Sequence, residues 1–171
     1  IKLCDISDNS GVIGEFTDTD NRSNFTYASS GAISIFEKQG GSVVWNVVTS
    51  NLFRDTSAWY HVVLAIDTTQ ATASNRLKLY VNGVQVTSWS TENYPSLNYE
   101  MQLFKATEKR IGQTATAGGF GDNMSGYMSE VCFIDGQQLT PSSFGETDAT
   151  TGNWVPKDVS GLTFGTNGFY L

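Results

Sequence analysis

The chain has 171 residues, of which 39% are hydrophobic and only 16% are charged, and its formal net charge is −7. This length suits one domain with a single packed core. The ten scattered basic residues provide no patch for nucleic acid, and no apolar run approaches the roughly 20 residues that span a bilayer. Because the sequence starts without an initiator methionine and ends on an apolar run, we expect residues 1–171 to be one domain cut from a longer chain.

A hairpin is predicted in the first third of the chain. Ala32–Lys38 and Ser42–Thr49 are rich in β-branched and aromatic residues and flank the glycine pair Gly40-Gly41. Weaker strand candidates precede them in "GVIGEFTD" and "NFTYAS". The first third therefore favours antiparallel strands over helices.

The clearest local signal lies between Tyr60 and Thr87. Tyr60–Asp67 is apolar on both faces, which is typical of a strand buried between two layers. Arg76–Val81 alternates polar and apolar residues, as a half-buried strand does. Asn82-Gly83 supplies the two residues that a type I′ turn needs, and Val84–Thr87 is expected to return as the next strand.

The remaining segments are short. "MQLFKA" and "KRIGQT" are predicted as strands and Ala115–Gly126 as a glycine-rich loop. Ser129–Thr140, which contains Glu, Cys and Asp, is interpreted as a closing strand and a turn before a helical turn at Pro141. Glu146–Gly161 is interpreted as an irregular segment that Trp154 holds on the body. Short strands at regular spacing with almost no helix predict an antiparallel β-sandwich.

Three motifs occur in an order that resembles a known family: Trp59-Tyr60-His61-Val62-Val63, then Leu79-Tyr80-Val81-Asn82-Gly83, then Gly126-Tyr127-Met128-Ser129-Glu130-Val131. This order is similar to that of concanavalin A-like and laminin G-like domains. From Phe53 to Leu171 the chain resembles the laminin G-like modules of marine and cyanobacterial bacteriophage structural proteins. The resemblance implies a jelly roll of the concanavalin A-like lectin/glucanase type, and a virion component at the surface of an extracellular particle.

Enzymes share that fold, and their activity depends on a pair of acids that face each other. Retaining glycosidases need two carboxyl groups about 5–5.5 Å apart, which i, i+2 spacing on a strand provides. Glu130 and Asp135 are five residues apart and would point to opposite faces, with Asp135 bonded within its own loop and Glu130 bonded to backbone amides or Arg110. The pairs Asp18/Asp20 and Glu146/Asp148 lie in segments that look like loops. We therefore expect no enzyme activity.

Other reactive groups are few. His61 is the only histidine and lies within the Tyr60–Asp67 strand, where a hydrogen-bonded structural imidazole is expected. Cys4 and Cys132 are more naturally two buried thiols than a disulfide, although a bridge between them stays open.

Two loops are candidate ligand sites. A carbohydrate could stack on aromatics in "TENYPSLNYE", with Tyr94, Asn98 and Tyr99, or in the loop of Phe120, Asp122 and Asn123. The same Asp122 and Asn123 offer hard oxygen ligands for Ca²⁺, which sandwiches of the resembled family often hold in rim loops. The alternative interpretation is ordinary turn chemistry, with the aromatic rings folded inward.

Two functions remain open. The first is a non-enzymatic bacteriophage structural module, in a tail, a fibre or the capsid surface, that packs against other virion proteins or its own copies and contacts host-surface glycans. The second is a carbohydrate-binding module or glycosidase-like domain of a secreted bacterial protein. Neither requires nucleic acid or a membrane as partner.

Overall fold

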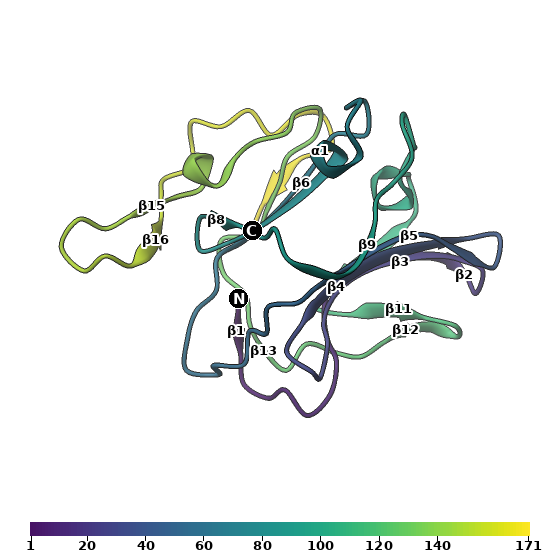
Figure 1. The fold of residues 1–171 in the computed structure, drawn as a ribbon, viewed down its shortest axis with the longest axis horizontal. Coiled ribbons are helices and arrows are strands. Elements are labelled where there is room, and N and C mark those ends of the chain that lie inside the picture. The colour runs from purple at the N-terminus through teal and green to yellow at the C-terminus, as the bar shows by residue number, and fades with distance from the viewer.

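The computed structural model describes every residue from Ile1 to Leu171 and is an antiparallel β-sandwich (Figure 1). The larger layer has six strands in the order β10-β2-β3-β4-β5-β9, all paired antiparallel. In that order they are Glu108–Ile111, Ser10–Asp18, Asn21–Tyr27, Ile33–Gln39, Ser42–Thr49 and Trp89–Asn93.

The smaller layer has three strands in the order β6-β7-β8, which are Val62–Ile66, Leu77–Val81 and Val84–Gln85. Its inner face supplies Leu77, Leu79 and Val81 to the same buried apolar cluster as Ile35 and Val47 of the six-stranded sheet. Burial of these side chains from both layers holds the sandwich together.

Four two-stranded ribbons complete the fold. They are β1 (Lys2–Leu3) with β13 (Gly126–Tyr127), β11 (Thr114–Thr116) with β12 (Gly119–Gly121), β14 (Cys132–Phe133) with β17 (Phe169–Tyr170), and β15 (Gly145–Thr147) with β16 (Trp154–Pro156). The helical elements are α1 (Ala73–Arg76), η1 (Gln102–Phe104) and η2 (Pro141–Ser143). None of them is long and apolar enough to cross a membrane.

The two hairpins predicted with glycine turns are confirmed. β4 and β5 pair around Gly40 and Gly41, and β7 turns into β8 through Asn82 and Gly83, all four with positive φ. Trp154 also does what was expected of it, because its ring packs directly over Gly83.

Three predictions of local structure are wrong. The "MQLFKA" segment contains the 3-10 turn η1 rather than a strand. Within Ala115–Gly126 the chain forms the β11–β12 hairpin, which covers the outer face of the six-stranded sheet. The third is the place of β6, which is an edge strand with mostly half-buried side chains rather than a strand enclosed on all sides.

The two cysteines are free thiols, and Cys4 is exposed rather than buried. The bridge between Cys4 and Cys132 that the sequence left open is not formed, and the expectation of two buried thiols is wrong for Cys4. Partial burial and the nearby Glu130 carboxylate raise the pKa of the Cys132 thiol, so this group is a poor nucleophile.

Candidate functional site

Two buried glutamates lie on the inner face of the six-stranded sheet. Glu15 of β2 is opposite Ser23 of β3, and Ser23 is opposite Glu37 of β4. Both glutamates are 0% exposed. The pair spans different strands, so the spacing of acids along any single strand does not reveal it.

The Glu37 carboxylate is closed off from solvent by the segment that follows β9. Tyr99 donates its hydroxyl to Glu37 Oε1 at 2.5 Å, and the Gln102 amide donates to Glu37 Oε2 at 3.0 Å. Burial raises the pKa of Glu37, and these hydrogen bonds offset part of that rise. A substrate has no access to this carboxylate. The two glutamates share a sheet face as catalytic acids would, but no opening leads to them.

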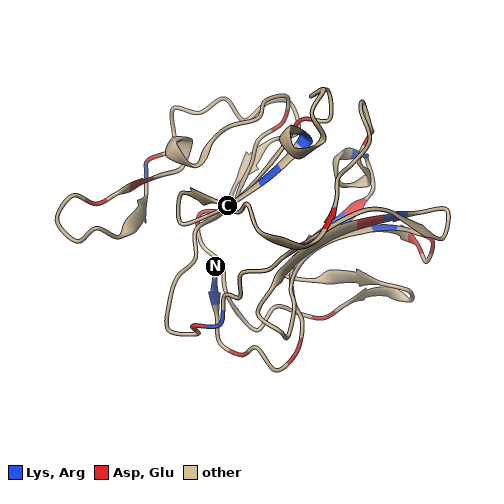
Figure 2. Cartoon of the chain, viewed as in Figure 1, with Lys and Arg blue, Asp and Glu red and all other residues tan.

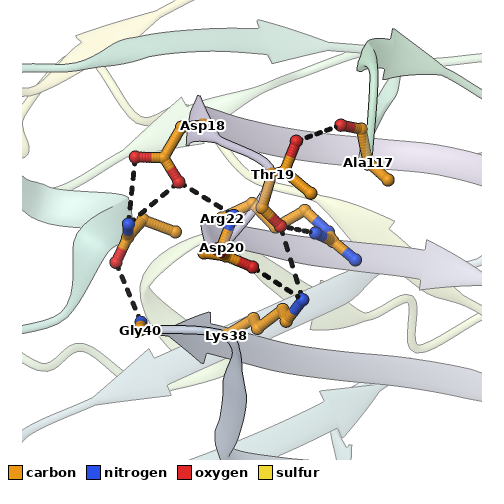
Figure 3. A network of polar contacts seen from close by, with 8 residues as sticks. Asp18, Thr19, Asp20, Arg22, Lys38, Gly40 and Ala117 are labelled. Atoms are coloured by element: carbon orange, nitrogen blue, oxygen red, sulfur yellow. Dashed lines mark hydrogen bonds and ion pairs between the residues drawn. The ribbon is translucent and has the colours of Figure 1, made fainter.

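Asp18, Asp20 and Asp148, which belong to the two i, i+2 acid pairs, bond to structural partners. In the turn between β2 and β3, both Asp18 oxygens accept from Asn21 Nδ2, and Asp20 pairs with Lys38 at 3.3 Å (Figure 3). Asp148 accepts the amides of its own turn at residues 150 and 151. These contacts are ordinary turn chemistry.

Glu130 and Asp135 bind residues of the C-terminal segment. Backbone amides or Arg110 were expected for Glu130, and its own loop for Asp135. Tyr170 donates its hydroxyl to Glu130, and Asn167 donates its side-chain amide to Asp135 at 2.9 Å. Arg110, the predicted partner of Glu130, instead pairs with Glu108 of its own strand. Glu130 and Asp135 are therefore structural residues, as predicted, but their partners are Tyr170 and Asn167.

The structure places Tyr94, Asn98 and Tyr99 in the segment after β9. Both tyrosine rings pack against the core, and their hydroxyls donate to Glu92 and Glu37 respectively. Asn98 is exposed in a left-handed turn, at φ 57°. Both rings pack inward and both hydroxyls are engaged, which favours the inward-folded interpretation.

Phe120, Asp122 and Asn123 lie at the end of the β11–β12 hairpin. One face of the Phe120 ring is covered by the Arg110 guanidinium, 4.3 Å from the ring centroid. The hairpin is bonded to Asn24, whose neighbour Ser23 points to the opposite sheet face. The two loops predicted as ligand sites therefore lie on opposite sides of the six-stranded sheet and do not form one site.

Calcium ligands are sparse in the Asp122 loop. Asp122 supplies the one carboxylate there, and the side-chain oxygen of Asn123 accepts from Gln113 Nε2 at 2.6 Å. No group of three or more His, Cys, Asp or Glu side chains in the chain could hold a metal ion. Since Ca²⁺ takes six to eight oxygen ligands, one carboxylate beside an engaged Asn123 does not fit it.

His61 is not the hydrogen-bonded imidazole that was expected. Its Nδ1 is buried without a partner, and its ring packs 5.6 Å from that of Trp154. Burial lowers the pKa of His61, so the ring is neutral at pH 7. It acts as a packing group between β6 and the C-terminal segment.

A solvent-open hollow of about 400 Å³ lies beside the C-terminus. Tyr170, which is 48% exposed, stacks on Phe164 with ring centroids 6.4 Å apart. Around this ring the hollow carries Glu130, Lys157 and Asp158. Hydrogen bonds from Ser160 lower the pKa of Asp158, which keeps that carboxylate charged at neutral pH.

The hollow was missed from the sequence. Its residues come from three separate segments, and Tyr170 was interpreted only as part of an apolar end. Charged side chains elsewhere are dispersed, with Lys and Arg interspersed among Asp and Glu (Figure 2). The hollow thus combines an accessible aromatic ring with charged groups of both signs.

A family model described as the concanavalin A-like lectin/glucanases superfamily matches residues 1–155. The chain belongs to this superfamily. No curated protein matches it in sequence. Lys157, Asp158 and Tyr170 lie beyond the matched residues, so most of the hollow is not part of the matched concanavalin A-like region.

Among solved structures, this concanavalin A-like domain is similar to the CBM40 of the Ruminococcus gnavus IT-sialidase, with a TM-score of 0.51 and 13% sequence identity. The alignment covers 73% of this chain and 66% of that chain, just under two thirds of the CBM40 structure. The likeness shows the jelly-roll fold predicted from the sequence. A bacteriophage origin is untested by these comparisons and stays a prediction.

Proposed function

We propose that this concanavalin A-like domain is a non-enzymatic carbohydrate-binding module that takes a glycan in the hollow beside Tyr170. The hollow carries the proposal, because it joins an exposed aromatic ring to charged hydrogen-bonding groups. An aromatic ring can cover the apolar face of a sugar, and Glu130, Lys157 and Asp158 can bond its hydroxyls. The fold shared with a CBM40 supports the same role.

A binding role rather than catalysis is supported by the two buried glutamates. Glu15 and Glu37 share one sheet face, as a glycosidase pair would, yet both are fully buried. Hydrolysis of a glycosidic bond needs both carboxyl groups against the substrate. Tyr99 and Gln102 cover the Glu37 carboxylate and keep a substrate away from it.

A second candidate is the structural module of a bacteriophage particle, packed against other virion proteins or copies of itself at the particle surface. Trp59 and Tyr127 favour it, since they are 52% and 62% exposed. They flank β1, because Tyr127 pairs with Lys2 and Tyr60 with Ile1. Large exposed aromatic side chains are enriched at protein interfaces. This role predicts self-association in sedimentation experiments, with no sugar dependence.

The test of the first role is a glycan array with the purified protein presented as a multivalent conjugate, because single-site sugar binding gains strongly from multivalency. For any glycan bound, Tyr170→Ala is expected to weaken binding about tenfold or more. Tyr127→Ala is the matched control, since it removes an even more exposed tyrosine outside the hollow. We expect equal binding in calcium and in EDTA.

Two results would contradict a glycan site in the hollow. One is a folded protein that binds no glycan at high valency. The other is an equal loss for Tyr170→Ala and Tyr127→Ala. Circular dichroism of each variant separates loss of binding from loss of fold.

A further inference from the structure

An apolar cavity of about 260 Å³ lies between β6 and the segment 128–134. Of the 26 residues that line it, 21 are hydrophobic. Every residue from Tyr60 to Ile66, and every residue from Met128 to Ile134, contributes to its wall. Since successive residues of an extended chain point to opposite faces, the unbroken run from Tyr60 to Ile66 places the cavity at the edge of β6. We call this cavity the strand slot.

The backbone of β6 is unpaired on the side of the strand slot. β6 pairs only with β7. The carbonyl of His61 and the amide of Asp67 both bond toward the β7 hairpin, at 2.8 and 2.9 Å. Because bonding direction alternates along an antiparallel strand, the backbone groups of Val62, Leu64 and Ile66 point into the slot. Polar backbone groups facing an apolar cavity are costly without partners, so the slot favours another strand.

Ile1 lies at one end of the slot and marks the line that such a strand would follow. Its amine donates to the Tyr60 carbonyl at 2.8 Å, and the Tyr60 amide donates to the Ile1 carbonyl at 2.8 Å. On the other side of β1, Lys2 pairs antiparallel with Tyr127. β1 therefore already runs between the two walls where the slot begins.

The register between Ile1 and Tyr60 extends into the slot. Counted back from Ile1, six further positions fall opposite 61–66, which all line the cavity. On the other wall the register with β13 ends at Glu130, whose φ of 56° interrupts the extended chain, and the backbone of Val131 bonds to Leu171. We propose that the strand slot is the seat of one further β-strand, antiparallel to β6 and made by polypeptide joined to Ile1.

The charge at Ile1 agrees with this assignment. Burial lowers the pKa of its amine to about 6, because an ammonium group is poorly solvated at the mouth of an apolar cavity. A peptide nitrogen in the same place keeps the bond to Tyr60 and carries no charge.

The seated strand has a defined pattern of side chains. The second, fourth and sixth residues before Ile1 pair with Val62, Leu64 and Ile66, whose side chains pack against the core. Paired residues on adjacent strands share a face, so these three positions are apolar. The first, third and fifth positions face the other side.

The experiment adds six residues, Val-Thr-Val-Thr-Val-Thr, directly before Ile1 of the full chain, which puts valine at the three inward positions. The control extension, Thr-Val-Thr-Val-Thr-Val, has the same composition in the opposite phase, which turns its apolar side outward. A capped Val-Thr-Val-Thr-Val-Thr peptide added to the unextended protein is the third arm. Amide hydrogen exchange and thermal unfolding are measured for each.

The in-phase extension is expected to slow exchange at Val62, Leu64 and Ile66 by about tenfold or more, and to raise Tm. The out-of-phase extension is expected to do neither. Equal effects of the two extensions, or no effect of either, overturn the proposal. Equal protection by the free peptide at the same concentration assigns the strand to a separate chain and overturns the link to Ile1.

Discussion

Glu15 and Glu37 share one face of the six-stranded sheet and differ in the charges that surround them. Glu15 stands opposite Lys109 of β10, whereas the partners of Glu37 are the neutral Tyr99 hydroxyl and the Gln102 amide. Their strands are two sheet spacings apart, which is about 9–10 Å. Two buried carboxylates at that separation repel, and only Glu15 has a cation opposite it. Glu37 is therefore the more unfavourable ion of the pair.

Glu37→Gln is expected to change how stability depends on pH. The pKa of Glu37 is raised in the folded protein, so the folded state binds this proton more tightly than the unfolded state. Its contribution to stability is present below the ordinary glutamate pKa and is lost as pH rises through the raised folded value. Urea unfolding between pH 4 and pH 8 should show the wild type losing free energy relative to the variant. Glu108→Gln, at an exposed position, is the control, and parallel pH profiles for wild type and Glu37→Gln would contradict the prediction.

Asn24→Asp is expected to loosen the β11–β12 hairpin. Asn24 Nδ2 donates to the Ala115 carbonyl at 2.8 Å, and the Ala115 amide donates to Asn24 Oδ1 at 2.5 Å. Aspartate keeps the acceptor, loses the donor and buries a charge, which costs about 1–3 kcal/mol. Unfolding free energy and amide exchange at Ala115 measure the loss. Asn123→Asp, at an exposed position of the following loop, should cost less than about 0.5 kcal/mol, and equal losses at both sites would refute the role of Asn24.

Gly83→Ala is expected to cost more than Gly40→Ala. Both glycines have positive φ, +79° and +56°, and alanine pays about 1 kcal/mol or more for such a conformation. At Gly83 an added Cβ would also lie 2.4 Å from the Trp154 ring, whereas at Gly40 it meets nothing within 4 Å. The difference in unfolding free energy should vanish in a Trp154→Ala background. If it persists there, contact with Trp154 is not its cause.

Acetylation of the Ile1 amine is expected to remove a gain of stability between pH 6 and pH 8. The amine pKa falls to about 6 in the folded chain, so over this range the unfolded chain holds more protons and stability rises with pH. The gain is about 1 kcal/mol after allowance for solvent screening. A residual slope is expected from His61, whose pKa is also lowered by burial. Identical profiles for the free and acetylated chains would mean that the amine is not desolvated.

Local patterns predicted the hairpins, because turn chemistry and alternation act over a few residues. The type I′ turn needs two residues with positive φ, and Asn82-Gly83 is one of the few dipeptides that adopt this conformation readily. "MQLFKA" failed for the opposite reason, since Met101 is buried in the core and the chain leaves a strand conformation directly after it. Short apolar runs do not distinguish a strand from a buried turn.

The candidate sites depended on contacts between distant segments. Tyr99 was predicted to stack on a sugar, but its hydroxyl donates a hydrogen bond to Glu37, which is 62 residues away in sequence. The hollow needs Tyr170 next to Glu130, which only the pairing of β14 with β17 provides. Register across strands is set by the whole sheet, so these neighbours are invisible in any short stretch of sequence.

The two hydrogen bonds of Asn24 are also incompatible with N-glycosylation of its side chain. Asn24-Phe25-Thr26 is an acceptor sequence for N-glycosylation. In the folded domain Asn24 is only 6% exposed, and its side-chain amide bonds to Ala115 through both its nitrogen and its oxygen. A glycan attached there would occupy the nitrogen that bonds the hairpin, and it has no room beneath β11. Glycosylation of Asn24 in the secretory pathway of a eukaryotic cell is therefore expected to keep the β11–β12 hairpin from packing on the sheet.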